Sequence, residues 1–186
     1  MTRSAVPVRT PTGDRWSGWL IGAIFAGCAT ALMLGVYARV HHPTGAALDL
    51  AGFSSAAYAK AWVATFAAVL ALVQVGSGAR PHRTEAPAWT APVHRWSGRV
   101  ALIVTVPVAV HCMYALGFQW DGVRVLLHSV LGCLFYGAFV AKMLVLTRRG
   151  MPSWSIPVLG GLLFTALAGL WLTSALWLFT TKGLHL

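Results

Sequence analysis

The chain has 186 residues, of which 58% are hydrophobic and only 10% are charged. Soluble domains carry roughly a quarter charged residues, and several runs here reach about 20 apolar residues, the length that crosses a bilayer. The composition therefore excludes a soluble globular domain and predicts an all-α integral membrane bundle, a multi-pass protein of the cell membrane. The formal net charge of +10 does not indicate nucleic-acid binding, because no basic stretch in a soluble domain carries interleaved aromatic residues.

Five transmembrane helices are predicted within one membrane domain, residues 1–186. In chain order they cover residues 17–38, 57–77, 95–117, 123–146 and 155–179. Residues 78–93, GARPHRTEAPAWTAPV, are rich in proline, alanine and charge and predict a cytoplasmic loop. No connection is long enough to hold a soluble catalytic domain.

The basic residues predict how the helices are oriented. Of the 14 Lys and Arg residues, ten lie in the N-terminus and in the loops around 78–99 and 142–152, and four lie on the other side. Because cytoplasmic loops carry the excess of Lys and Arg, we expect the N-terminus inside the cell and the C-terminus outside.

Two of the seven histidines, His111 and His128, lie within predicted spans, where ionisable residues are costly and often functional. With a rise of 1.5 Å per residue, each lies roughly 8–10 Å below the loop that joins the third and fourth helices. Two imidazoles at equal depth on neighbouring helices suit a haem iron held from both sides. The alternative is that both histidines form interhelical hydrogen bonds.

Residues near this pair are predicted to form the cofactor pocket. Gly132 follows His128 by four residues and shares its face of the helix, so the missing side chain leaves room for a porphyrin. Phe135 continues that face, and Tyr114 follows His111 by three residues. We expect one haem b with His111 and His128 as its metal ligands.

Three other histidines are secondary candidates. His94 lies 17 residues before His111, roughly 25 Å along a helix, so the two cannot serve one iron. Because His94 lacks a partner, a second haem is not expected; His94 caps a helix end or contacts a headgroup, a haem propionate or a quinone. His41 and His42 follow the first helix, where they are either solvated or lie beside an outer haem edge or quinol pocket.

Hydrolase, nucleotide-binding and zinc-protease motifs are absent from the sequence. The three cysteines form no CxxC, so a covalently attached c-type haem is excluded. The acids are Asp14, Asp49, Glu85 and Asp121, none of which falls in the middle of a span. This argues against a transporter that works through intramembrane carboxylates.

Three segments, HRWSGR (94–99), HCMYALG (111–117) and LLHSVLGCLFYGAFVAKMLVL (126–146), resemble the small membrane cytochromes b of the ferric-reductase-like and ascorbate-reducible type. The chain as a whole resembles a group of alanine-rich multi-span proteins from actinobacteria. The resemblance implies haem b held by histidines of neighbouring helices. Those cytochromes carry two histidine pairs, whereas only His111 and His128 match here. The resemblance therefore implies one haem near the outer face rather than a complete path across the membrane.

The sequence thus predicts a haem b-binding membrane subunit in electron transfer, with the haem in the outer half of the bilayer and a quinol as a candidate redox partner. It would be the membrane subunit of an oxidoreductase, since the chain contains no flavin or nicotinamide domain, and a partner protein on the outer face would exchange electrons with it. The alternative is a non-redox scaffold or accessory subunit with structural histidines.

Overall fold

The computed structural model describes residues 14–46, 52–79 and 87–185, and these residues form helices and their connections without a β-strand. The helical elements are α1 (Asp14–Val40), α2 (Ala56–Gly78), α3 (Thr90–His111), η2 (Cys112–Leu116), α4 (Val123–Leu146), α5 (Ser155–Trp171), η3 (Leu172–Leu176) and α6 (Trp177–Lys182). They make five continuous apolar helical segments long enough to cross a membrane. The predicted all-α architecture with five spans is confirmed.

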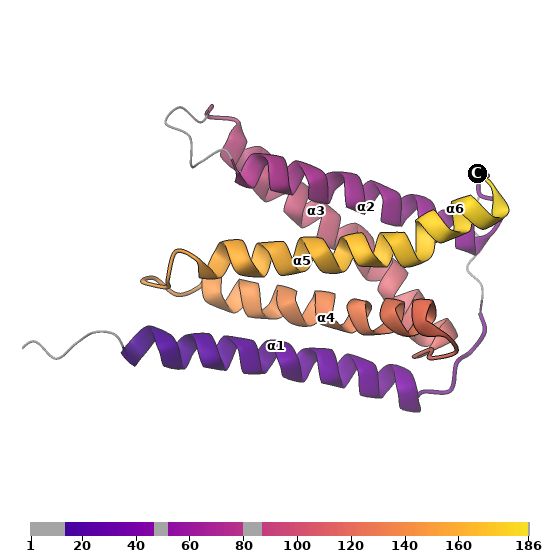
Figure 1. Ribbon diagram of the computed structural model, residues 1–186, viewed down its shortest axis with the longest axis horizontal. Coiled ribbons are helices and arrows are strands. Elements are labelled where there is room, and N and C mark those ends of the chain that lie inside the picture. Colours follow the sequence, from indigo (N-terminus) through magenta and orange to yellow (C-terminus); the bar gives the residue numbers. More distant parts are fainter. Residues whose placement is uncertain (1–13, 47–51, 80–86, 186) are drawn as a thin grey trace, which may run out of the picture.

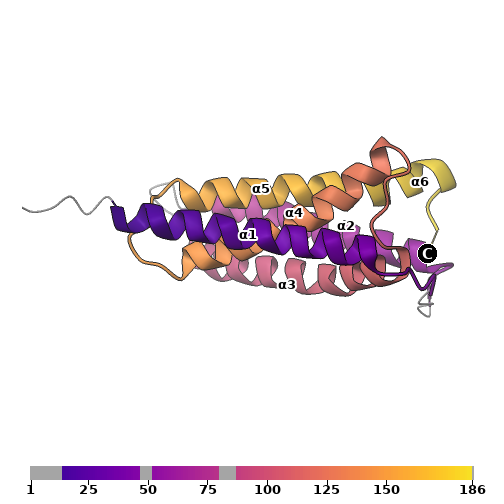
Figure 2. The same cartoon turned by 90° about the horizontal axis from the view of Figure 1, so that it is seen from below.

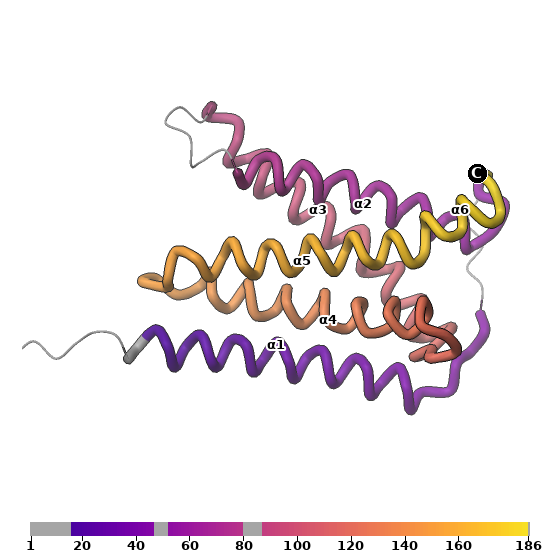
Figure 3. The backbone as a smooth tube through the Cα atoms, in the orientation of Figure 1, coloured from indigo at the N-terminus to yellow at the C-terminus, as the bar shows by residue number. Residues whose placement is uncertain are grey.

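The helices pack as a row rather than in chain order. α4 lies between α1 and α5, α5 also contacts α2, and α3 packs against α2. Figures 1 and 2 show the elongated bundle, with α1 beginning at one end and α6 finishing at the other. We call these the N-terminal end and the C-terminal end of the bundle. The tube in Figure 3 shows α3 passing behind α5 to reach the start of α4.

Small residues set the distance between α1 and α4. A Cβ atom on Gly27 would lie 2.6 Å from the carbonyl oxygen of Gly137, and a Cβ on Gly137 would lie 2.5 Å from that of Gly27. The two backbones can approach this closely only because both positions lack a side chain. Helix pairs in membranes commonly use small residues in this way, because lipid supplies no hydrophobic force that drives helices together.

The interior of the bundle is built largely from alanine. One core cluster combines Ala67, Ala71 and Ala166 with Phe135 and Leu167. Many large apolar side chains of the described residues, such as Phe25 and Ile103, are exposed. Small residues inside and large apolar residues outside are the reverse of the arrangement in a soluble protein, and they fit helices surrounded by lipid.

Three boundaries differ from the sequence prediction by three residues or more; one of them is the start of α1, at Asp14 rather than at residue 17. α3 begins at Thr90, so residues 90–93 of the predicted loop are helical; Pro92 is tolerated because first-turn amides have no helical partner. The last span continues through α6 to Lys182 instead of ending near 179. Residues 80–86, the centre of the predicted loop, lie outside the described part of the chain.

Candidate functional site

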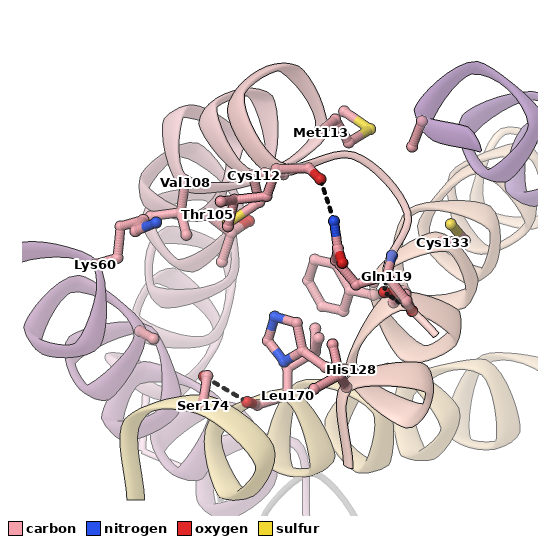
Figure 4. A pocket seen from close by; sticks show the side chains of 18 of the residues that line it. Lys60, Thr105, Val108, Cys112, Met113, Gln119, His128, Cys133, Leu170 and Ser174 are labelled. Carbon is pink, nitrogen blue, oxygen red and sulfur yellow. Dashed lines mark hydrogen bonds between the residues drawn. The ribbon is translucent and has the colours of Figure 1, made fainter. Parts of the chain in front are cut away.

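A cavity of about 400 Å³ lies at the C-terminal end of the bundle, between α2, α3 with η2, α4, and α5 with η3 and α6. Most of its wall is apolar, including Val63, Val108 and Leu170. Figure 4 shows His128 reaching from α4 into this space, with Lys60 and Cys112 on other walls. Apolar cavities of this size with a few polar groups are typical of ligand sites.

The orientation of His128 is fixed by a hydrogen bond to η3, the turn that continues α5. Its Nδ1 lies 3.0 Å from Thr173 Oγ1. The Thr173 hydroxyl donates its only proton to the Gly169 carbonyl at 2.7 Å, so the Nδ1–H of His128 is the donor. In the neutral imidazole Nε2 then carries the lone pair, and in Figure 4 this second ring nitrogen points into the cavity. In its neutral form this imidazole can accept a proton from the cavity or bind a metal there.

Two π-helical turns, η2 and η3, contribute residues to the cavity wall. In η2 the Gly117 amide donates to the Cys112 carbonyl, five residues earlier, at 3.0 Å, and η2 places Cys112 and Met113 on the cavity wall. In η3 the widened turn carries Thr173, the partner of His128, and Ser174, which lines the cavity. Such turns are rare and occur frequently at functional sites.

Two cationic side chains also line the cavity. Arg124 Nη1 donates to the Thr173 carbonyl at 2.7 Å, and its guanidinium lies 3.9 Å from the centre of the Trp177 ring. Lys60 of α2 lines the same cavity as His128 and Cys112. Within the described part of the chain neither cation is paired with a carboxylate. The site therefore combines an apolar volume with unneutralised positive charge.

Two of the pocket residues predicted from the sequence lie at this cavity. Gly132 and Phe135 both line it, and Phe135 is buried. A Cβ on Gly132 would meet only Leu170, at 3.9 Å, so the glycine does leave open space beside His128, as its spacing predicts.

His111 and Tyr114 lie elsewhere. His111 Nε2 donates to the Ala46 carbonyl at 3.0 Å, which ties α3 to the segment after α1, and His111 is not part of the cavity wall. The Tyr114 ring is stacked on His41 at 4.8 Å, while His42 is exposed. The structure thus brings His128, Gly132 and Phe135 together and leaves His111, Tyr114 and His41 outside the cavity wall.

Comparison with known protein families adds one finding. Residues 9–186 match a family described as a family of unknown function (DUF6529). The chain belongs to this family. The match covers all five helices and therefore both the cavity and His111. Neither the curated proteins nor the solved structures contain a match to this chain.

In this DUF6529 protein, His94 lies near the N-terminal end of the bundle, in the first turns of α3. Its Nδ1 is 3.0 Å from Ser77 Oγ of α2. Gln74, also from α2, donates to the carbonyl of His94 and to Ser97 Oγ. Gly98 makes room for this glutamine, because a Cβ there would lie 3.0 Å from Gln74 Oε1. His94 is thus part of a polar contact between α2 and α3, remote from the cavity.

Sequence reasoning did not identify Lys60, Arg124, Cys112 or Thr173 as site residues. Lys60 could have been found, since it is an ionisable residue inside a span. Arg124 precedes His128 by four residues and so shares its helix face. No sequence pattern marks Thr173 as the hydrogen-bond partner of His128, because that contact depends on how η3 packs against α4.

Proposed function

We propose that this protein is a haem b-binding membrane subunit that takes part in electron transfer, with the haem in the cavity beside His128. The observation that carries the proposal is the His128 imidazole: its Nδ1–H is bound by Thr173, and its other nitrogen faces an apolar cavity. Metal-ligating histidines are commonly held in this way by a hydrogen bond from the second ring nitrogen.

The other residues of the cavity also fit this group. Haem carries a flat apolar ring and two acidic side groups. Gly132 leaves space beside His128, and Lys60 and Arg124 supply positive charge for the acidic groups. When bound, a haem supplies one-electron redox chemistry, while the chain sets its ligation and its surroundings.

The proposed ligation differs from the pair predicted from the sequence. His111 is bound to the Ala46 carbonyl outside the cavity, so His128 is the one imidazole among the lining residues. The wall formed by η2 offers sulfur atoms from Cys112 and Met113, and both residue types ligate haem iron in other proteins. We therefore assign His128 as the iron ligand and give His111 a structural role.

A membrane quinone is the second candidate ligand. A quinol needs one hydrogen-bond acceptor and an apolar channel, and a single imidazole with a free lone pair in an apolar cavity meets that need. The described residues contain no group of three or more metal-ligating side chains, which is compatible with either ligand because haem brings its own four nitrogen ligands.

The absorption spectrum of the purified protein tests the proposal. Haem-replete expression in the cell membrane should give a b-type spectrum that disappears in His128→Ala. A colourless, stable protein from which solvent extracts a quinone would favour the second candidate. A colourless protein without a bound quinone would favour the scaffold role, with His128 as interhelical contact.

A further inference from the structure

Lys142 is a half-buried cation at the opposite end of the bundle from the cavity. It lies on α4, and its Nζ is 3.7 Å from the position of a Cβ on Gly160 of α5. Within the residues that the structure describes, Lys142 forms no hydrogen bond or ion pair.

The depth of this ammonium group is that of the lipid headgroup boundary. α4 has 24 residues, about 36 Å of helix, against a hydrocarbon core of about 30 Å. A centred helix therefore extends about 3 Å beyond the core at each end. Lys142 lies four residues before the end of α4, about 6 Å inward, so its backbone is only about 3 Å inside the hydrocarbon.

The lysine side chain does not extend outward from the end of α4. Gly160 lies five residues after the start of α5, about 7.5 Å from that end, so Nζ beside it remains near the depth of its own backbone. A cation held there without a carboxylate is costly in a membrane. Basic pockets between membrane helices bind the headgroups of anionic lipids and thereby remove this cost.

We propose that Lys142, beside Gly160, binds a phosphate group, supplied by the headgroup of an anionic phospholipid at the N-terminal end of the bundle. The missing side chain of Gly160 provides the space that the phosphate occupies next to the ammonium group. This lipid site is independent of the haem proposal, since it shares no residue with the cavity.

Native mass spectrometry of the purified full-length chain tests this site. Anionic phosphatidylglycerol and zwitterionic phosphatidylcholine are added in turn, and the bound lipids are counted. We expect Lys142→Gln to bind phosphatidylglycerol about tenfold more weakly, the effect of losing one charge-assisted hydrogen bond. Lys142→Arg should retain binding, and so should the control Lys182→Gln, which removes an exposed lysine at the other end.

A second variant keeps the charge and fills the space. Gly160→Leu places carbon atoms beside the ammonium group and should also weaken phosphatidylglycerol binding about tenfold, while thermal unfolding shows that each variant is folded. If inorganic phosphate alone raises the thermal stability of the wild type as much as the lipid does, the phosphate site is retained, with a free anion as its ligand. Unchanged phosphatidylglycerol binding by Lys142→Gln overturns the proposal.

A further variant tests Glu85, the one acid in the loop predicted at residues 78–93. Tighter phosphatidylglycerol binding by Glu85→Gln also overturns the proposal, because Glu85, which lies outside the described residues, would then be the partner of Lys142.

Discussion

Thr173 on η3 accepts a hydrogen bond from His128 on α4 across 3.0 Å, and this contact determines which nitrogen of the imidazole faces the cavity. Thr173 is itself anchored twice, through its hydroxyl to the Gly169 carbonyl and through its carbonyl to Arg124. The widened turn of η3 thus connects the orientation of His128 to one of the two cations of the cavity. A single contact between two helices therefore sets both the direction and the tautomer of the proposed iron ligand.

Replacing Thr173 by valine should weaken haem binding while leaving the protein folded. Valine keeps the branched shape but cannot accept the Nδ1–H bond, so the imidazole loses its fixed direction. Loss of such a partner typically costs 10–100-fold in metal affinity, and haem titration followed by absorbance measures it. Thr165→Val, at an exposed threonine of the same helix, is the control and should bind haem as the wild type does.

The two intramembrane histidines should respond differently to alanine substitution. His128→Ala should abolish the b-type spectrum, because the proposed iron ligand is gone. His111→Ala should retain the spectrum and lower thermal stability by about 1 kcal/mol, through loss of the bond to the Ala46 carbonyl. Equal loss of the spectrum in both variants would mean that the two imidazoles ligate one iron, as their matched depth suggests, and would refute the ligand assignment made from the cavity.

The sequence was sufficient for the five spans, and it also pointed to the face of α4 that lines the candidate site. Spans follow from apolar length, and Gly132 and Phe135 follow from helical spacing after His128, so both features are local. The partner of His128 is not local. Depth along a helix can be counted in residues, but rotation about the helix axis depends on packing. α3 packs against α2 and directs His111 toward Ala46, which depth alone does not reveal.

The contact between Gly27 and Gly137 should be sensitive to a single methyl group. Gly27→Ala would place its Cβ 2.6 Å from a backbone carbonyl, so α1 and α4 must separate, at a cost of about 1–3 kcal/mol. Thermal or SDS-induced unfolding in detergent measures this loss. Gly22→Ala, on the same helix with nothing within 4 Å, should be neutral; equal stability of the two variants would argue against a tight α1–α4 contact.

The ends of the chain should report opposite sides of the membrane. α1 begins at one end of the bundle and α6 finishes at the other, and the excess of Lys and Arg predicts that the N-terminus is cytoplasmic. A reporter that is active only in the cytoplasm should work at the N-terminus, and one that is active only outside should work at the C-terminus. Inverted results would move the cavity to the cytoplasmic half of the bilayer.

Filling the cavity should remove its ligand without touching any polar group. Gly132→Leu adds a side chain where a Cβ meets only Leu170 at 3.9 Å, so the remaining carbon atoms extend into the open volume beside His128. We expect the b-type spectrum to be lost although His128, Thr173 and the two cations are intact. Gly161→Leu, at an exposed glycine of α5 with nothing within 4 Å, is the matched control and should remain coloured. If Gly132→Leu is folded and binds haem as the wild type does, the haem lies outside this cavity and His128 is not its ligand there.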